Sequence, residues 1–307
     1  MTTEHPTADI VVVGSINADL TVTVARHPAP GETLLGGGGG ITAGGKGANQ
    51  AVAAALQGAS VAMVAAVGKD PYAEPATEHL RSSGVNMSSV AEVDETTGLA
   101  VITVSEDGEN NIVVVPGANA TVDAAYVESR ADVIAGAGLV LLQGEIPADG
   151  FAAAVRLATG RVVVNLAPVI EVDRASLLKA DPIMANEHEA GLILEQLGAG
   201  IPSEEPTDLA QALLDAGFPS VVLTLGGAGA LVADASGVTP IATPSVSSVD
   251  STGAGDAFAG AFVARLVAGD DLVPAAEFAA RVGAFSVTGH GAQASYPGPD
   301  DALPACE

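Results

Sequence analysis

The stretch GANQAVAAALQGASVAMVAAVG, residues 47–68, joins an Ala-rich segment to a β-branched one and contains no charged residue. It does not fit a membrane span, which needs about 20 predominantly apolar residues, because polar residues and glycines interrupt it at Asn49, Gln50, Gln57, Gly58 and Ser60. A helix over Lys46–Leu56 followed by a strand over Val61–Val67 fits the pattern better. This helix–strand unit is the building block of α/β folds.

Further β-branched runs alternate with helical stretches, at Ile10–Val13, Leu139–Leu142, Val162–Asn165 and Val221–Leu225. These runs are continuously apolar, as expected of parallel strands that helices cover on both faces. The pattern predicts an α/β fold, with a three-layer α/β/α core around a mainly parallel sheet. In such folds ligands bind at the carboxyl ends of the strands.

Two pairs of segments depart from this alternation of strands and helices. The first pair is Leu20–Val24 with Thr33–Ile41, and the second is Leu99–Val104 with Asn111–Val115. The second pair flanks Asp107-Gly108, a strong hairpin signal. We therefore expect a small antiparallel sheet, inserted from about 17–43 and 97–116, which acts as a lid on a single domain over residues 1–307. Within it, the run Gly36–Gly40 indicates flexibility or a bulge, with a tolerant surface loop as the alternative.

Composition excludes several classes of partner. The chain is 48% hydrophobic, enough for a large core without disulfides or metals. Its 37 acidic and 11 basic residues give a net charge of −26, which argues against binding to nucleic acid or to anionic membranes. The one cysteine, Cys306, cannot form an internal disulfide, and Met1–Asp9 lacks the features of a secretory signal. We expect a cytoplasmic protein.

The strongest chemical signal is VDSTGAGDAF, residues 249–258, which leads into a helical pattern over Ala257–Ala268. The small residues Gly253, Ala254 and Gly255 leave backbone N–H groups exposed at a helix N-terminus, where an anion such as a transferring phosphoryl group can bind. An aspartate in this position, Asp256, is more often a helix cap. The flanking Gly253 and Gly255, together with a second carboxylate at Asp250, favour a phosphate cradle with a catalytic base.

A P-loop is excluded, because Gly44-Gly45-Lys46-Gly47-Ala48-Asn49 has the wrong spacing. The ordered set of motifs instead resembles the ribokinase family of the PfkB carbohydrate kinases, a group that includes adenosine kinase. The resemblance covers nearly the whole chain and rests on Gly14–Asp19, Pro30–Thr33, Gly44–Ala51, Pro116–Asn119, Gln143–Pro147, Asn165–Pro168, Asn186–Glu189, Thr224–Gly229, Gly253–Asp256 and Gly291–Gln293.

The resemblance implies a pentose site. The residues that it assigns to the sugar hydroxyls are Asn17, Asp19, Gly44, Gly45, Lys46, Asn49, Glu145 and Asp256. Their amide and carboxylate groups suit adjacent hydroxyls, and a buried site of this kind rejects analogues that lack them. Taken singly, a turn asparagine, a capping asparagine and a surface lysine would be the ordinary interpretations of Asn17, Asn49 and Lys46.

The resemblance also implies an ATP site at Asn186, Glu189, Thr224, Gly226, Gly227, Gly229 and Gly255. Asn186 and Glu189, after a strand-like Asp181–Ala185, would orient the triphosphate and the water shell of its Mg²⁺. His188 has no partner at ligand spacing and is expected to face solvent. An activating K⁺ is implied beside the anion cradle, held by oxygens of Asp250, Thr252, Ser286, Gly289, Gly291 and Ser295.

The expected activity is ATP-dependent phosphorylation of a pentose, with D-ribose to D-ribose 5-phosphate as the leading case. Asp256 would accept the hydroxyl proton while the amides of Gly253, Ala254 and Gly255 and the side chain of Lys46 stabilise the phosphoryl group. The alternatives are a related kinase for deoxyribose, a nucleoside or another sugar, and a non-catalytic sugar-binding protein on the same scaffold. The resemblance further implies a homodimer formed through the lid.

Overall fold

The main sheet of the computed structural model, which describes residues 8–107, 109–201 and 203–306, has nine strands in the order β13-β12-β11-β10-β9-β8-β1-β4-β5. Their bounds are β1 Ile10–Val13, β4 Val61–Gly68, β5 Asn86–Val93, β8 Leu139–Gln143, β9 Arg161–Asn165, β10 Ile183–Asn186, β11 Val221–Thr224, β12 Ala230–Asp234 and β13 Gly237–Ile241. The strands from β11 to β5 are parallel, and β12 and β13 add an antiparallel edge. The predicted mainly parallel sheet is confirmed.

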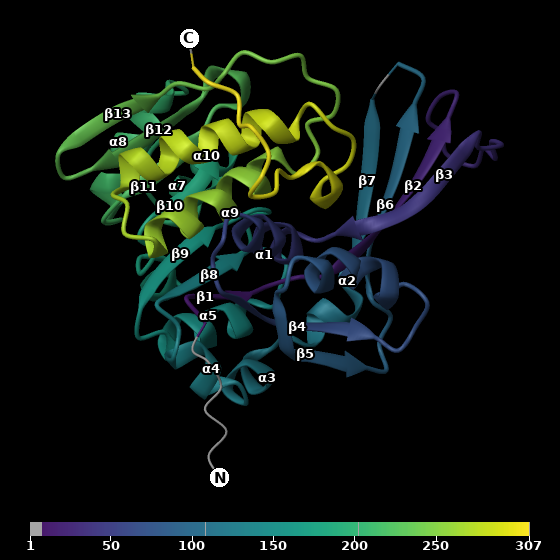
Figure 1. The fold of residues 1–307 in the computed structure, drawn as a ribbon, viewed down its shortest axis with the longest axis horizontal. Coiled ribbons are helices and arrows are strands. Elements are labelled where there is room, and N and C mark those ends of the chain that lie inside the picture. The colour runs from purple at the N-terminus through teal and green to yellow at the C-terminus, as the bar shows by residue number, and fades with distance from the viewer. Residues whose placement is uncertain (1–7, 108, 202, 307) are drawn as a thin grey trace.

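Helices cover both faces of this sheet (Figure 1). On one face lie α1 Lys46–Leu56, α2 Ala73–Ser82, α9 Ala254–Val267 and α10 Leu272–Ser286. On the other lie α3 Ala124–Glu128, α4 Ala131–Ala135, α5 Ala148–Leu157, α6 Arg174–Leu177, α7 Glu187–Gln196 and α8 Pro206–Ala216. Ile10 and Val12 belong to the first core and Val11 and Val13 to the second, which explains why the strand is continuously apolar.

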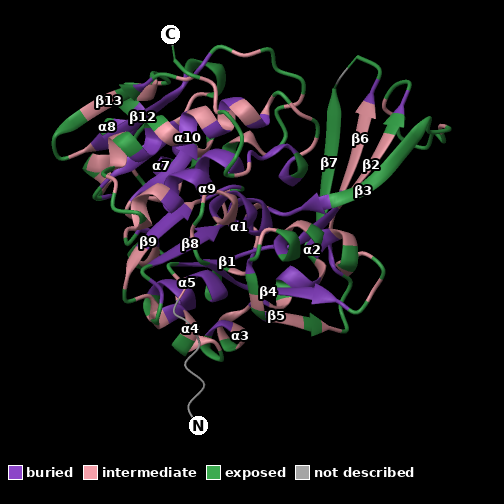
Figure 2. Ribbon diagram, viewed as in Figure 1, coloured by how far each residue is buried: buried purple, intermediate pink, exposed green. Residues whose placement is uncertain are grey.

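Short 3₁₀ turns complete the body: η1 Gly117–Thr121, η2 Gly226–Ala228 and η3 Gln293–Ser295. Within the described ranges, no helix has both the length and the apolar character needed to cross a membrane. Figure 2 shows buried strands at the centre of the body, whereas in the second sheet β3 (Gly38–Gly44) and β7 (Asn110–Val115) are mainly exposed and β2 (Asn17–Val24) and β6 (Gly98–Ser105) mainly intermediate.

Element boundaries depart from the prediction where glycine redirects the backbone. Helix α1 has the predicted bounds, whereas α9 starts at Ala254 rather than Ala257. Its N-cap residue, Gly253, has φ +73°, a left-handed conformation that L side chains rarely adopt, and this turn starts the helix one turn early. The strand expected to end at Leu225 ends at Thr224, and η2 begins two residues later at Gly226.

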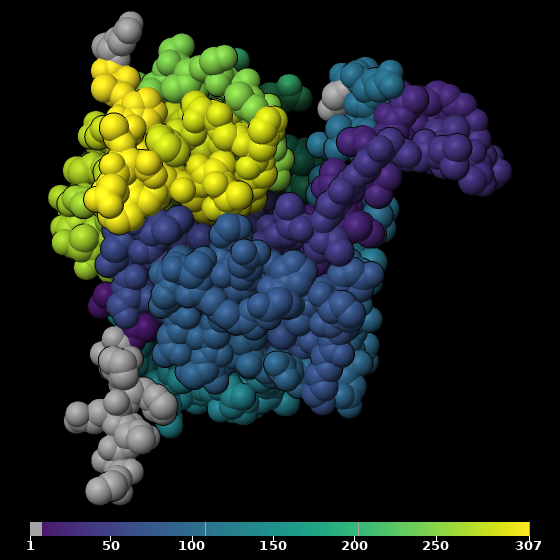
Figure 3. Space-filling view, turned by 45° about the vertical axis from the view of Figure 1, so that its right-hand side comes forward, coloured from purple at the N-terminus to yellow at the C-terminus, as the bar shows by residue number. Residues whose placement is uncertain are grey.

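The second sheet has the order β3-β2-β6-β7, with β2 Asn17–Val24, β3 Gly38–Gly44, β6 Gly98–Ser105 and β7 Asn110–Val115. The pairs β2–β3 and β6–β7 are antiparallel, as predicted. The central pair β2–β6 is parallel, because each hairpin leaves the body through its first strand and the two lie side by side. We call this sheet the lid; it stands away from the C-terminal half across a hollow (Figure 3).

The glycine run divides between a loop and a strand. Gly38, Gly39 and Gly40 belong to β3, while residues 33–37 precede it. A Cβ on Gly39 would lie 2.1 Å from the Thr21 carbonyl oxygen, so this position requires glycine. The predicted Asp107-Gly108 turn lies partly outside the described residues, since Gly108 is not among them.

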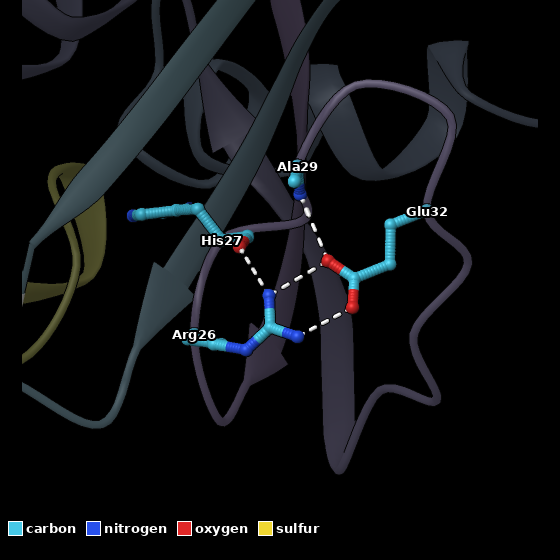
Figure 4. A network of polar contacts seen from close by, with 4 residues as sticks. All are labelled: Arg26, His27, Ala29 and Glu32. Carbon is cyan, nitrogen blue, oxygen red and sulfur yellow. Dashed lines mark hydrogen bonds and ion pairs between the residues drawn. The ribbon is translucent and has the colours of Figure 1, made fainter.

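A polar cluster orders the loop between β2 and β3 (Figure 4). The Arg26 guanidinium donates to both carboxylate oxygens of Glu32 and to the His27 carbonyl oxygen at 3.2 Å. Glu32 also accepts the Ala29 N–H at 3.0 Å. Because these groups are solvent-exposed, the tip of the lid is held by local polar contacts rather than by a core.

Candidate active site

A cavity of about 240 Å³ opens at the carboxyl ends of β9, β10 and β11, against the first turns of α1 and α9. This is the edge of the sheet where the fold class places ligands. Polar residues and glycines make up most of its lining, namely Lys46, Asn165, Asn186, Glu189, Thr224, Ser251, Gly253, Gly255 and Asp256.

The Asp256 carboxylate is buried in the first turn of α9, with 6% of the residue exposed. One oxygen, Oδ2, accepts a hydrogen bond from Asn49 Nδ2 at 2.9 Å, and Oδ1 accepts one from Gln50 Nε2 at 2.8 Å. The N-cap residue of this helix is Gly253, and it makes no side-chain cap bond. The ordinary capping interpretation of Asp256 is therefore wrong, because its carboxylate is held by helix α1 instead.

The first turn of α9 contains backbone N–H groups that are free to bind a ligand. Within the described part of the chain, the N–H groups of Gly255 and Asp256 have no protein acceptor. The Ala254 N–H, expected in the cradle, donates to the Ser251 carbonyl oxygen at 3.2 Å in this conformation. Tyr296 Oη donates to the Gly253 carbonyl oxygen at 3.0 Å. A Cβ on Gly253 would lie 2.6 Å from that Oη, so glycine is needed here.

The sugar residues expected from the resemblance lie where β3 and β2 meet the body. Asn17 faces Gly44 across the β2–β3 ladder, and its Oδ1 accepts from Asn119 Nδ2 at 2.7 Å. A Cβ on Gly44 would lie 2.1 Å from Asp19 Oδ1, so the glycine leaves the space that this carboxylate fills. Gly45 has φ +87° and starts α1 against the backbone of Asn17.

Glu145 closes the same region from the end of β8. Its Oε2 accepts from the Lys46 N–H at 2.9 Å and from Ser15 Oγ at 2.5 Å. The hydroxyl of Ser15 in turn accepts from the Gly47 N–H at 3.2 Å. The start of α1 is thus fixed to the strand ends by a carboxylate.

Four carboxylates, those of Asp19, Glu145, Glu189 and Asp256, and the ammonium group of Lys46 lie in or beside the site. Burial, followed by the charges of Glu145 and Asp256, raises the pKa of Asp19 from 3.8 to about 7. The charge of Asp256 raises the pKa of Lys46, with further contributions from Glu145 and Glu189 that outweigh its desolvation. Lys46 therefore remains a cation beside the cavity, in a chain whose net charge is −26.

A second cavity of about 410 Å³ adjoins the first and shares Thr224, Ser251, Ala254 and Gly255 with it. Gly226, Gly227 and Gly229 form one part of its lining. Apolar side chains form another part, chiefly Val246, Phe258, Ala280, Ala284 and Val287, and Thr243, Ser245 and Ser248 add hydroxyl groups. An apolar slot that opens onto a polar cavity suits a planar base attached to phosphates.

Asn186 and Glu189 form the capping box of α7. Asn186 Oδ1 accepts from the Glu189 N–H at 2.8 Å, and Glu189 Oε2 accepts from the Asn186 N–H at 2.9 Å. Both residues also line the first cavity, so a structural bond and a ligand contact are compatible there. His188, between them, is exposed as expected.

The residues expected around K⁺ lie on two loops, at the last residue of α10 (Ser286) and in η3 (Ser295). Asp250 accepts from the N–H groups of Thr252 at 2.9 Å and Gly291 at 2.8 Å. Burial alone would raise the pKa of Asp250, but these hydrogen bonds and the nearby His290 lower it overall. A Cβ on Gly289 would lie 3.0 Å from Ser295 Cβ and 3.9 Å from the Ser286 carbonyl oxygen. Across the described residues, no group of three or more His, Cys, Asp or Glu side chains could hold a metal ion.

Several residues of the site were not assigned a role from the sequence. They are Ser15, Gln50, Asn119, Gln143, Asn165, Gln293 and Tyr296, together with the apolar wall of the second cavity. All of these residues except Tyr296 lie inside the motifs quoted above, so membership of a motif was a signal for them. The apolar wall carries no such signal, because alanine and valine there look like ordinary core.

Comparison with known proteins places this geometry among sugar kinases. The model described as pfkB family carbohydrate kinase matches residues 7–299. A ribokinase of Schizosaccharomyces pombe is 36% identical over 301 residues, covering 94% of this chain and 95% of that protein. A deoxyribokinase of Salmonella typhi is 34% identical over 297 residues, covering 94% and 95%.

A solved structure of Arabidopsis thaliana ribokinase, complexed with ribose and ATP, superposes with a TM-score of 0.86 at 30% identity, covering 95% of this chain and 96% of that one. The three-layer core and the separate four-stranded sheet are shared with that structure. The resemblance inferred from the motifs is confirmed, and so is the fold class.

Proposed function

Because the chain belongs to the pfkB family of carbohydrate kinases, we propose that it transfers the γ-phosphoryl group of ATP to the 5-hydroxyl of D-ribose. One observation supports this above the others. The buried Asp256 carboxylate and the amides of Gly255 and Asp256 border a single cavity, in which a base and a phosphate cradle would meet the same reacting atoms.

The proposed step is an in-line displacement. The 5-hydroxyl oxygen of ribose forms a bond to the γ-phosphorus, and the bond from that phosphorus to the β,γ-bridging oxygen breaks. ADP leaves with the electron pair of the broken bond, and the hydroxyl proton passes to Asp256. Charge on the phosphoryl oxygens would be stabilised by the α9 amides and by the Lys46 ammonium group, which lines the same cavity.

The sugar would be held between the lid and α1. Asp19 and Glu145 offer acceptors for hydroxyl hydrogens, and Asn17 and Asn49 offer amides. Ribose and 2-deoxyribose differ by one hydroxyl, and relatives of this chain carry both names. We favour ribose because the expected sugar residues are all present, and a polar site of this kind discriminates against a missing hydroxyl.

ATP would place its base in the apolar slot and its phosphates in the polar cavity, beside Asn186, Glu189, Thr224 and Gly226–Gly229. Mg²⁺, when bound, would supply positive charge that offsets the charge of the phosphates. It keeps several waters, so the lack of a carboxylate cluster in the described residues is compatible with it. Asn186 and Glu189 would hold its water shell.

We propose K⁺ as an activator at the loops around Asp250. A single carboxylate among backbone and hydroxyl oxygens from Thr252, Ser286, Gly289, Gly291 and Ser295 is a donor set that suits a weakly charged ion. Replacing K⁺ by choline at constant ionic strength should lower the turnover number. Equal rates in the two salts would remove this part of the proposal.

We also propose a homodimer formed through the lid, in the cytoplasm. Strand β7 is an edge strand with four consecutive exposed apolar residues, Ile112, Val113, Val114 and Val115, between 42% and 64% exposed. An unpaired apolar edge of this kind is suited to pairing with a second copy.

The proposed activity is tested by ADP release with MgATP and a panel of acceptors, namely D-ribose, 2-deoxy-D-ribose, nucleosides and hexoses. Preference for ribose supports the proposal, and preference for another acceptor would redefine the substrate. Ribose binding without ADP formation from any acceptor would instead favour the non-catalytic sugar-binding protein.

A further inference from the structure

Two chains of buried side-chain amides end on the Asp256 carboxylate. In the first, Gln143 Nε2 donates to Gln50 Oε1 at 2.7 Å, and Gln50 Nε2 donates to Asp256 Oδ1 at 2.8 Å. In the second, Gln293 Nε2 donates to Asn49 Oδ1 at 2.8 Å, and Asn49 Nδ2 donates to Asp256 Oδ2 at 2.9 Å. All four amide residues are buried, so water does not replace these bonds.

The hydrogen bonds of the neighbouring Asn165 fix the orientation of the Gln50 amide in the first chain of amides. Asn165 Nδ2 donates to the Met184 carbonyl oxygen at 3.2 Å, so Asn165 Oδ1 is left to face Gln50. Gln50 Nε2 uses one hydrogen on Asn165 Oδ1, at 2.8 Å, and the other on Asp256 Oδ1. A flipped Gln50 amide would turn its oxygen toward two acceptors and its nitrogen toward a donor, and would lose three bonds.

We propose that Gln50 is a positioning residue for the base, and that Gln143 acts through it. The proposal rests on the kinase function proposed above. Gln50 can only donate to Oδ1, which keeps that oxygen an acceptor and holds the carboxylate plane toward the cavity. The proton removed from the sugar hydroxyl must then occupy a lone pair of Asp256 that faces the cavity.

Other titratable groups lie around Asp256 on the neighbouring elements. They are Asp19 on β2, Lys46 on α1, Glu145 after β8, Glu189 on α7 and Tyr296 after η3. These groups stay in place when only Gln50 is changed. A shift in the pH profile of a Gln50 variant is therefore assigned to the contact that was altered.

The discriminating variant is Gln50→Glu, which keeps size and shape but places a carboxylate against Asp256 Oδ1. Two carboxylates at this distance share a proton, so the acidic limb of the kcat profile should move up by about one pH unit or more. Gln50→Met removes the donor without adding charge. It should lower kcat about 10- to 100-fold, with a small change in KM for ribose, because the base is misplaced while the sugar contacts remain.

Gln57→Glu is the matched control. Gln57 directly follows α1, and its Nε2 donates to the Pro297 carbonyl oxygen at 2.8 Å, away from both cavities. The same chemical change there should leave kcat and its pH profile at the wild-type values. Gln143→Met should lower kcat in the same direction as Gln50→Met, and the double variant should be no slower than Gln50→Met alone.

Wild-type protein without ribose-dependent ADP release would contradict the proposed function. An active wild type combined with a folded Gln50→Glu whose pH profile is unchanged would overturn the positioning role. If Gln50→Glu does not fold, as judged by circular dichroism, then Gln50→Met and Gln143→Met decide. A wild-type kcat in both variants overturns the proposal, and a loss in kcat at unchanged KM supports it.

Discussion

At the scale of single residues, the ionisation of Asp19 should make binding at the proposed sugar site depend on pH. Its pKa of about 7 arises from burial and from the charges of Glu145 and Asp256, so it titrates near neutrality. An ionised carboxylate accepts hydrogen bonds from two hydroxyls, whereas the protonated form uses one oxygen as a donor. The affinity for a sugar should therefore depend on pH between about 6 and 8.

We expect KM for ribose to rise as the pH falls through about 7. In Asp19→Asn, KM should be higher at every pH and should lose this dependence. Steady-state kinetics from pH 6 to 8.5 measures both. A wild-type KM that stays flat over this range would contradict the assignment of Asp19 to the sugar.

The same pKa predicts the effect of Asp19 on stability. The folded-state pKa, about 7, lies above the ordinary aspartate value of 3.8, so the folded protein binds this proton more tightly than the unfolded chain. The stabilisation is complete below about pH 4 and is lost as the pH rises toward 7. Asp19→Asn should therefore be at least as stable as the wild type at pH 8, as thermal unfolding would show. A markedly lower melting temperature at that pH would show that the ionised carboxylate stabilises the fold.

The Tyr296 hydroxyl should support the anion cradle. Tyr296→Phe removes only the hydrogen bond to the Gly253 carbonyl oxygen and leaves the ring in place. The Gly253 carbonyl oxygen still accepts the Ala257 N–H at 2.8 Å in this variant, so we expect a stability loss of only about 0.5–1.5 kcal/mol, for one lost hydrogen bond, and a kcat lowered about tenfold.

Tyr126→Phe is the control for this change, because Tyr126 Oη donates to the Ala65 and Ser89 carbonyl oxygens at 3.0 and 2.7 Å, far from the cavities. It should cost stability and leave kcat unchanged. Equal kcat in the two phenylalanine variants would mean that Tyr296 serves only the fold.

At the scale of elements, the contact between α1 and α9 brings the side-chain amides of Asn49 and Gln50 to Asp256, the proposed base. A Cβ on Gly260 of α9 would lie 2.5 Å from Ala53 Cβ and 2.5 Å from the Gln50 carbonyl oxygen on α1. The two helices therefore pack backbone to backbone at this point. This close approach allows the short side chains of Asn49 and Gln50 to reach Asp256.

Gly260→Ala should push α1 away from α9. We expect a loss of about 1–3 kcal/mol in the free energy of unfolding, from overpacking, and a fall in kcat that exceeds any change in KM for ATP. Gly191→Ala in α7 is the control, because its Cβ would meet only the Ile201 side chain at 3.7 Å. It should be neutral or stabilising by about 0.5–1 kcal/mol. An active, stable Gly260→Ala protein would contradict the role of this contact.

The sequence predicts elements better than it predicts how elements meet. Continuous apolar runs at residues 10–13 and 61–68 suffice for parallel strands. The start of α9 at Ala254 was not predicted, because the left-handed turn at Gly253 that begins the helix leaves no periodic pattern in the sequence. The parallel β2–β6 pairing was not predictable, because hairpin signals act over a few residues whereas this pair joins segments about 80 residues apart. The bonds from Gln143 and Gln293 to α1 are similarly long-range, at 93 and 244 residues.

At the scale of the whole molecule, the net negative charge and the exposed apolar strand of the lid determine how two copies of the protein can associate. A net charge of −26 keeps the protein soluble by self-repulsion, so association of two copies needs an apolar surface. The four exposed apolar residues of β7 supply one, whereas much of the rest of the lid surface is polar or glycine.

Val113→Asp in the centre of β7 should therefore give a monomer, measured by light scattering after size-exclusion chromatography. Leu192→Asp is the control, since Leu192 is also exposed, at 37%, but lies on α7 in the body. A dimer that survives Val113→Asp, or a monomeric wild type, would contradict lid-mediated association.

Whether Asp256 is the base is decided by the rate of ribose-dependent ADP release from Asp256→Asn. Wild-type protein with MgATP should turn over ribose. Asp256→Asn should lose about 10²- to 10⁴-fold in kcat while still binding ribose and ATP by calorimetry. An Asp256→Asn protein with near wild-type turnover would contradict the role of Asp256, because the carboxylate would then not be needed to accept the hydroxyl proton.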